Sequence, residues 1–187
     1  MNAGLIILLV LGAMIVWAIG LYNKLVRQRQ LVNEGFSGID VQLKRRADLI
    51  PNLVETVKGY MGHEKAVLEK VTELRTQSQQ VPQGDLKARA DIEGQISGAL
   101  SKIMMVAENY PDLKASQNYT ELMQNLSSIE NDIQLARRYY NGSVRDMNTM
   151  VQSFPGNLVA GKFGFKEAQY FELENAADRA VPSVKIQ

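Results

Sequence analysis

Cysteine is missing from this sequence, and histidine and tryptophan occur once each. The absence of cysteine excludes disulfide frameworks, thiolate metal sites and thiol nucleophiles, and it leaves the redox compartment open. Charged side chains are missing from one long stretch, residues 1–23, although the chain of 187 residues has 21 basic and 20 acidic side chains. All of the charge therefore belongs to the remainder of the chain, which is long enough for one domain with a hydrophobic core.

The single histidine, His63, is followed by Glu64 within a predicted helix. A zinc-protease helix needs a second histidine four residues after the first, so that both imidazoles face one metal ion. Position 67 is a valine. We therefore expect His63 to lie on the surface or to pack between helices, and we predict no metal site.

Charge balance and motifs argue against two further classes of function. The formal net charge of +1 does not provide the basic face that a nucleic-acid-binding protein needs. The sequence contains no Gly-rich phosphate loop, no nucleophile elbow and no coenzyme fingerprint. We therefore predict no nucleic-acid partner, no cofactor, no catalytic residue and no enzymatic activity.

The uncharged N-terminal stretch predicts a membrane anchor. Residues 3–23 read AGLIILLVLGAMIVWAIGLYN, and twenty such residues in a helix span roughly 30 Å, the thickness of a bilayer's hydrocarbon core. We predict a transmembrane helix over residues 1–23. The side chains expected to contact lipid or its interface include Leu5, Ile6, Leu9, Ile15, Trp17 and Tyr22.

A cleaved signal peptide is the alternative interpretation of this stretch. A signal peptide needs a positively charged start and a cleavage site between small residues. Ala18-Ile19-Gly20 resembles such a site, but no Lys or Arg precedes it. We therefore expect an uncleaved anchor.

Charges beside the anchor predict its orientation. Lys24, Arg27 and Arg29 follow the apolar stretch directly, whereas no charged side chain precedes it. Because cytoplasmic flanks are enriched in Lys and Arg, we expect the N-terminus outside and the large domain on the cytoplasmic side of a bacterial inner membrane.

The rest of the chain predicts an all-α protein in which the transmembrane helix continues into an antiparallel bundle of about four long helices, residues 24–155. Apolar residues recur at helical steps after residue 24, and no strand-like alternation is present. The first helix is expected over residues 3–50, with Pro51 starting a second helix or introducing a kink. Asp85 is placed to cap a third helix, and a long fourth helix is expected from about residue 116 to Phe154.

The C-terminal segment, residues 156–187, has a different character. Phe163, Phe165, Tyr170 and Phe171 lie close together without a long helical period. A cluster of aromatic side chains is disfavoured in water, so we expect this tail to dock on the bundle, on a neighbouring subunit or on lipid headgroups. The last residues predict a short polar helix followed by Pro182.

Four blocks of the sequence resemble the bacterial LemA family. They are YNKLV at 22–26, IDVQLKRRADLIPNLVETVKGYMGHE at 39–64, AENYPDLKASQNYTELMQNLSSIENDIQLARRYYNGSVRDMNT at 107–149, and QSFPGNLVAGKFGF at 152–165 with YFE at 170–172. The blocks keep the family's order and spacing over nearly the whole chain. One departure is Gly35-Phe36-Ser37, where relatives often have Ala-Trp-Ser.

The resemblance implies a single N-terminal membrane anchor, an antiparallel helical bundle and no established enzymatic activity. Relatives are often encoded near membrane metalloproteases, which associates the family with such partners. The resemblance therefore says more about architecture than about function.

Two groups of residues are candidates for a site. Glu130, Asn131, Arg137 and Asn141 lie among apolar neighbours of the long fourth helix, and they predict a buried polar network or the frame of a small pocket. The basic triplet Lys44-Arg45-Arg46 is expected on a solvated face or bridging to an acidic neighbour.

Glycines inside predicted helices suggest close contact between helix backbones. Gly94 and Gly98 form a pattern of two small residues four apart, and Gly35, Gly38, Gly59 and Gly62 also interrupt predicted helices. Each interior glycine costs roughly 1 kcal/mol relative to alanine, so helix contact within or between chains is one explanation and tolerance on exposed faces is the other. The candidate interface residues are Gly94, Gly98, Phe163, Phe165, Tyr170 and Phe171.

These observations favour a non-catalytic protein that is anchored in a lipid bilayer and acts as a homo-oligomeric membrane scaffold. The alternative is an adaptor or sensor module that serves a membrane protease or a signalling partner. Stoichiometric self-association would favour the first, and one dominant foreign partner would favour the second.

Overall fold

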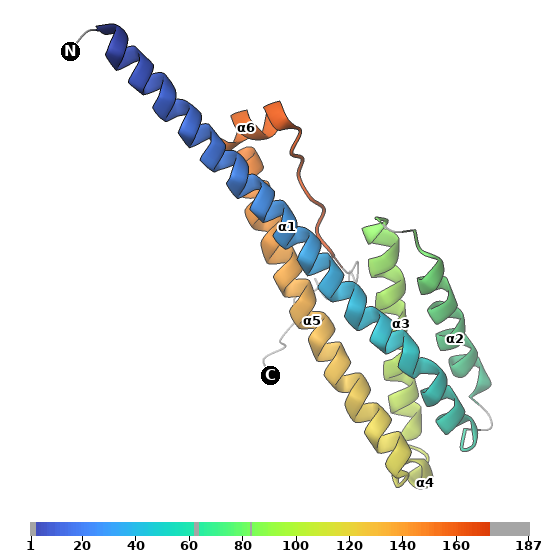
Figure 1. Ribbon diagram of the computed structural model, residues 1–187. Coiled ribbons are helices and arrows are strands. Elements are labelled where there is room, and N and C mark those ends of the chain that lie inside the picture. Colours follow the sequence, from blue (N-terminus) through green and yellow to red (C-terminus); the bar gives the residue numbers. More distant parts are fainter. Residues whose placement is uncertain (1–2, 62–63, 83, 173–187) are drawn as a thin grey trace, which may run out of the picture. The chain divides into compact units, whose positions relative to one another are not determined.

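The computed structural model describes residues 3–61, 64–82 and 84–172, and every regular element within these ranges is a helix. The helices are α1 (Ala3–Lys58), α2 (Lys65–Gln80), α3 (Leu86–Ala107), α4 (Pro111–Lys114), α5 (Gln117–Gln152) and α6 (Gly156–Phe163) (Figure 1). The predicted all-α class with a long apolar N-terminal helix is confirmed. His63 and the expected helix beyond residue 172 lie outside the described residues.

The described residues form two compact units, and both long helices contribute to each. The first unit contains residues 3–40 of α1, residues 134–152 of α5, and the segment that follows to Tyr170. The second unit contains residues 41–133 together with Phe171 and Glu172.

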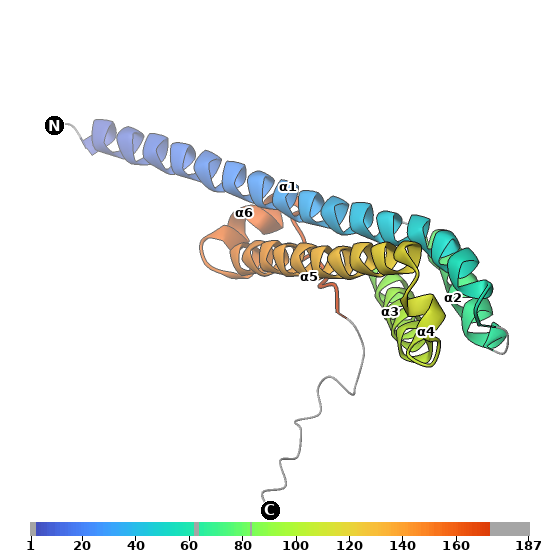
Figure 2. The ribbon, with the colours of Figure 1, turned by 90° about the horizontal axis from the view of Figure 1, so that it is seen from below.

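In the first unit, α1 and α5 run side by side in opposite directions, as both views show (Figures 1 and 2). Their contact is closest at Gly35, where an added Cβ atom would lie 3.0 Å from the Cα atom of Tyr140. The Phe36 and Tyr140 rings pack with centroids 6.2 Å apart, and the Gln28 side chain donates a hydrogen bond to the Ser143 carbonyl at 3.0 Å. The glycine at position 35 therefore serves close helix packing, whereas Gly38 faces open space.

The second unit is an up-down arrangement of four helices: the end of α1, α2, α3 and the start of α5 (Figure 1). One hydrophobic core joins these helices, and its members recur at helical spacing on each of them. They include Ile50, Leu53, Val57, Leu68, Val71, Leu74, Ile96, Leu100, Ile103, Leu113 and Leu126. The antiparallel order follows from the short connections between successive helices.

The termini of several helices match their local chemistry. Asp85 accepts a hydrogen bond from the Ala88 backbone N–H at 3.0 Å, which confirms the predicted cap of α3. Gly164 ends α6 with φ of 70°, a left-handed conformation that favours glycine over other residues. The C-terminal segment, for which no long helical period was predicted, begins with this short helix of eight residues, in which Val159 and Ala160 are buried.

Pro51 neither starts a new helix nor ends α1, which continues to Lys58. A proline has no backbone N–H, so the carbonyl of Ala47, four residues earlier, loses its helical partner. The Arg75 side chain on α2 donates a hydrogen bond from Nε to this carbonyl at 2.7 Å. A side chain from a neighbouring helix thus replaces the missing backbone donor. Of the two alternatives predicted at Pro51, the start of a new helix was therefore wrong.

This replacement predicts energetic coupling between Arg75 and Pro51. Arg75→Ala should lower the free energy of unfolding by about 1–2 kcal/mol, because it leaves the Ala47 carbonyl without a strong donor. In a Pro51→Ala background the restored backbone N–H satisfies that carbonyl, so Arg75→Ala should cost clearly less. Thermal and chemical unfolding of the four full-length variants in detergent, followed by circular dichroism, gives the coupling energy. Equal costs in the two backgrounds would contradict the explanation.

Candidate functional site

The most unusual surface of the described chain is the N-terminal part of α1. An 18-residue window within α1 has a mean hydropathy of 2.7, and none of it is buried against other described residues. Large apolar side chains are exposed all round this segment: Leu5, Ile6, Leu9 and Ile15 are each more than two-fifths exposed, and Trp17 is 51% exposed. By length and composition the segment is compatible with a membrane anchor.

The character of α1 changes abruptly after Tyr22. Lys24 is the first charged side chain, and Leu25 is the first fully buried one. From Leu25 onward, buried apolar residues such as Val32 and Ile39 lie on one face, and charged side chains lie on the others. The part of α1 before Tyr22 is therefore apolar on all faces, and the part after Lys24 is amphipathic.

A cluster of aromatic rings lies where the exposed apolar segment ends. The Tyr22 ring packs edge-on against Phe163 and Phe165, with centroids 4.9 and 5.6 Å away. The Arg29 guanidinium lies 5.2 Å from the centroid of the Phe165 ring. This cluster connects α1 with Phe163 at the end of α6 and with Phe165, two residues later.

The segment after α6 is fastened to α5 by polar contacts. The Asn148 side chain donates to the Ala168 carbonyl at 3.0 Å and accepts from the Ala168 N–H at 2.8 Å. The Tyr140 hydroxyl donates to the Gln169 carbonyl at 2.8 Å, and burial raises the pKa of Tyr140 above its usual value. Part of the C-terminal segment therefore docks on its own chain.

The four aromatic residues predicted for an interface differ in how far they are buried by this docking. Phe165 and Phe171 are almost fully buried. Phe163 is 57% exposed and Tyr170 is 42% exposed. Phe165 and Phe171 therefore pack within the chain, whereas Phe163 and Tyr170 keep a large exposed fraction.

The second unit contains a buried ionic cluster centred on Arg46. Arg46 is only 2% exposed, and its guanidinium lies 2.5 Å from carboxylate oxygens of both Glu93 on α3 and Glu130 on α5. It also donates to the Ser97 hydroxyl at 2.7 Å and to the Glu93 carbonyl at 3.2 Å. The Ser78 hydroxyl on α2 donates to the other oxygen of the Glu93 carboxylate. The cluster therefore links all four helices of this unit.

Of the two alternatives predicted for the basic triplet, Arg46 bridges to acidic neighbours rather than lying on a solvated face. The sequence carried a signal of its burial. The buried positions of α1 in this region, Ile39, Leu43, Ile50 and Leu53, are separated by steps that include position 46 in the same stripe. Glu93 likewise interrupts the stripe of Ala90, Ile96 and Ile103 on α3. Opposite charges at core positions of two helices indicate a buried pair, since a lone buried charge is too costly.

The predicted network on α5 is only partly found. Glu130 belongs to the Arg46 cluster, with its side chain 36% exposed. Asn131 is exposed, so its predicted burial was wrong. Arg137 and Asn141 are half-buried residues of the first unit, and Arg137 donates to Gln134 at 3.4 Å. The polar network thus uses residues of four helices rather than successive turns of one.

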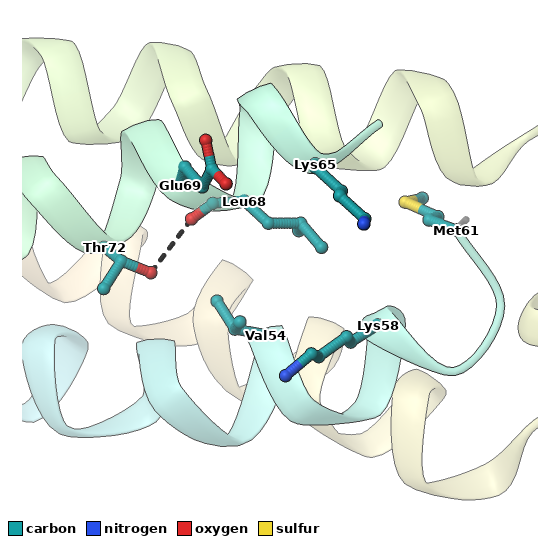
Figure 3. A pocket seen from close by; sticks show the side chains of 7 residues that line it. All are labelled: Val54, Lys58, Met61, Lys65, Leu68, Glu69 and Thr72. Carbon is teal, nitrogen blue, oxygen red and sulfur yellow. Dashed lines mark hydrogen bonds between the residues drawn. The ribbon is translucent and has the colours of Figure 1, made fainter. Parts of the chain in front are cut away.

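Two of the surface grooves in the second unit have largely apolar linings. One, of about 640 Å³, lies between the end of α1 and α2, with Val54, Met61 and Leu68 among its lining residues. Lys58 and Lys65 point into this space from opposite walls (Figure 3). The other groove, of about 530 Å³, lies between α2 and α3 and includes Gly98, where an added Cβ atom would meet nothing within 4 Å. Gly94, one turn earlier on α3, is half-buried.

Among the residues with described positions, no group of three or more His, Cys, Asp or Glu side chains is arranged to hold a metal ion. The Glu64 carboxylate instead accepts a hydrogen bond from the Tyr110 hydroxyl at 2.8 Å, which raises the pKa of Tyr110. The Glu64–Tyr110 hydrogen bond and the Arg46 cluster thus both link separate segments of the bundle.

Comparison with known proteins agrees with this architecture. A model of the LemA family matches residues 35–186, which include most of the second unit and part of the first. The chain belongs to the LemA family. Protein LemA of Metamycoplasma hominis is 26% identical over 168 residues, which cover 90% of this chain and 76% of that protein.

Two further relatives in the family have a different name. Magnetosome protein MamQ 2 of Paramagnetospirillum magneticum is 26% identical over 184 residues, covering 86% of this chain and 68% of the relative. Magnetosome protein MamQ of Magnetospirillum gryphiswaldense is 24% identical, covering 88% of this chain and 70% of the relative.

The Arg46 cluster predicts an unequal response of neighbouring arginines to substitution. Arg46→Met should lower the free energy of unfolding by about 3–5 kcal/mol, because it leaves the buried Glu93 carboxylate without its partner. Arg46→Met combined with Glu93→Leu should recover much of this loss, since both charges are then removed together.

Arg45→Met is the matched control for these variants. The Arg45 side chain is 57% exposed and lies 3.8 Å from Asp132, so its substitution should change stability by less than about 1 kcal/mol. Denaturant unfolding of the full-length proteins measures all three variants. Similar losses for Arg45→Met and Arg46→Met would refute the central position of Arg46.

Proposed function

We propose that this protein is a non-catalytic membrane scaffold, anchored by α1 and assembled from several copies of the same chain. The observation that carries the proposal is the exposed apolar segment of α1, which has a mean hydropathy of 2.7 and no cover from the described chain. Leaving some twenty apolar side chains in water would cost about 1 kcal/mol or more for each, so the segment needs a hydrocarbon environment.

The flanking charges support one orientation of the scaffold. Lys24, Arg27 and Arg29 are exposed directly after the apolar segment. Because such charges favour the cytoplasmic side, we propose that the N-terminus lies outside and that the chain after residue 23 lies in the cytoplasm, at the bacterial inner membrane. The aromatic rings of Trp17 and Tyr22 suit the interface on that side.

The groove that contains Gly98 supports self-association. Its lining includes Val67 and Leu74 of α2 and Ala99 of α3, and the missing side chain at Gly98 leaves room for a helix to approach the backbone. Two relatives carry names that refer to the magnetosome rather than to a reaction, which is in keeping with a structural role. We therefore propose Gly98, with Gly94 beside it, as part of the contact between copies.

Substitution of Gly98 tests the assembly. Native mass spectrometry of the full-length protein in lipid nanodiscs should show oligomers for the wild type. Gly98→Leu fills the groove and should weaken association at least tenfold, equivalent to about 1.4 kcal/mol. Gly38→Leu is the control, because it also replaces an exposed glycine within a helix and has open surroundings. Monomers of the wild type at every concentration would overturn the scaffold.

The groove between α1 and α2 favours a second candidate function, an adaptor for a membrane protease or another membrane protein. Its apolar lining and the two facing lysines suit a partner segment that places an apolar side chain beside a carboxylate (Figure 3). In this proposal the groove binds a foreign protein rather than a second copy.

A photo-crosslinking amino acid at Glu69, inside this groove, tests the adaptor. In intact membranes it should form a stoichiometric adduct with one foreign membrane protein, and Lys58→Glu with Lys65→Glu should abolish the adduct by charge repulsion. The same crosslinker at Thr76, an exposed position on the next part of α2 and not among the groove residues, should give little product. Adducts with copies of this chain alone would exclude the adaptor and favour the scaffold.

A further inference from the structure

Helix α6 and the turn before it expose large apolar side chains without cover from the rest of the described chain. Phe154 is 78% exposed, Leu158 is 63% exposed and Phe163 is 57% exposed. Val159 and Ala160 of the same helix are buried, and Leu158 lies roughly opposite them, whereas Phe163 lies on their side and contacts Tyr22. The apolar side chains that this short helix and the turn before it leave exposed favour contact with another apolar surface.

The position of α6 along α1 identifies what lies beside this surface. The Phe163 ring contacts the Tyr22 ring at 4.9 Å, and Tyr22 is the last aromatic residue before the first charge, Lys24. Both views place α6 against α1 within the first unit (Figures 1 and 2). The exposed face of α6 is therefore continuous with the end of the apolar segment that requires a bilayer.

The charges around α6 match the headgroup region of such a bilayer. Lys24, Arg27 and Arg29 on α1 are exposed, as are Lys162 in the last turn of α6 and Lys166 after it. The sequence of α6, GNLVAGKF, contains no acidic residue, and Glu167 is the next carboxylate along the chain. Exposed aromatic and aliphatic side chains bordered by cations are the pattern of segments that lie in the interface of an anionic membrane.

We infer that α6 is an interfacial foot: Phe154, Leu158 and Phe163 enter the headgroup–acyl boundary of the same bilayer that α1 crosses, and Lys162 and Lys166 contact anionic lipid headgroups. This inference rests on the proposed membrane anchoring of α1. The foot gives the first unit a second attachment beside the anchor, which restricts rotation and tilt of the α1–α5 pair relative to the bilayer plane. A scaffold that assembles laterally benefits from this restriction, because copies then meet in one orientation.

Depth-dependent quenching of a single tryptophan tests the foot. The chain has one tryptophan, so Trp17→Phe provides a tryptophan-free background for Leu158→Trp. The full-length protein is reconstituted in vesicles of phosphatidylcholine and phosphatidylglycerol with bromine atoms either near the glycerol or near the chain ends. The Leu158→Trp reporter should be quenched at least twofold more strongly by bromine near the glycerol than by bromine near the chain ends.

Arg138→Trp in the same background is the control reporter. Arg138 is an exposed residue of α5, some twenty residues before Leu158, and the helix places it roughly 20 Å away from the end that meets α6. It should not be quenched by either lipid. Replacing phosphatidylglycerol by phosphatidylcholine, or introducing Lys162→Glu, should reduce quenching of the Leu158→Trp reporter. The same changes should leave the quenching of Trp17 unchanged when Trp17 is retained and position 158 is leucine.

The outcomes separate the foot from the membrane anchor. Quenching of the native Trp17 without quenching of Leu158→Trp overturns the foot and leaves the anchor intact. Absence of quenching at both positions overturns the anchor as well. A Leu158→Trp reporter that is shielded from lipid, and whose emission depends on protein concentration, would show that a second copy covers α6 and would also overturn the foot.

Discussion

The rest of the structure depends on one constraint: the first twenty or so residues of α1 are apolar on every face, and nothing in the described chain covers them. A helix satisfies its own backbone hydrogen bonds, so such a segment is stable in hydrocarbon, whereas in water its side chains would drive aggregation. The amphipathic part of α1 begins at Leu25, immediately after the first charge. The same helix therefore supplies both a surface for lipid and a face for packing against α5.

Within the second unit, polar contacts specify which helices pack together. The hydrophobic core would tolerate several helix arrangements of similar volume. Arg46 reaches carboxylates on α3 and α5, and Arg75 of α2 reaches the carbonyl that Pro51 leaves free on α1. Both contacts need one particular alignment of their helices, so they select an arrangement as well as stabilising it.

Much of the fold was predictable from the sequence, because it depends on patterns within single helices. The apolar period, the Asp85 cap and the chain break before it placed α3, and the long stripe from Tyr119 to Val151 placed α5. Features that depend on contacts between distant residues were missed. The continuation of α1 past Pro51 is stabilised by Arg75, which lies 28 positions from its acceptor Ala47 and carries no local sign of its role. A bridge from the basic triplet to an acidic neighbour was one of two predicted alternatives, but the burial of Arg46 was not foreseen, although its position in the apolar stripe indicated it.

For the candidate sites too, features that depend on one helix were predictable and features that depend on contacts between helices were not. The membrane segment was predictable, since composition alone decides whether a helix is compatible with lipid. The network around Glu130 was sought along one helix, but ionic partners in a bundle come from facing helices, which a single sequence does not pair. The exposed face of α6 could not be recognised in advance, because Phe163 and Phe165 are two residues apart in the same short segment and only their packing distinguishes the exposed ring from the buried one.

The most direct test of the membrane anchor is the accessibility of single cysteines, which this cysteine-free chain permits without further substitutions. Val10→Cys lies in the middle of the apolar segment, and Ser101→Cys lies on an exposed face of α3. In native membranes treated with a maleimide, the account predicts that Ser101→Cys reacts at once and that Val10→Cys reacts only after the bilayer is dissolved and the protein is denatured. Rapid reaction of Val10→Cys in intact membranes, or recovery of the full-length protein in the soluble fraction, would contradict it.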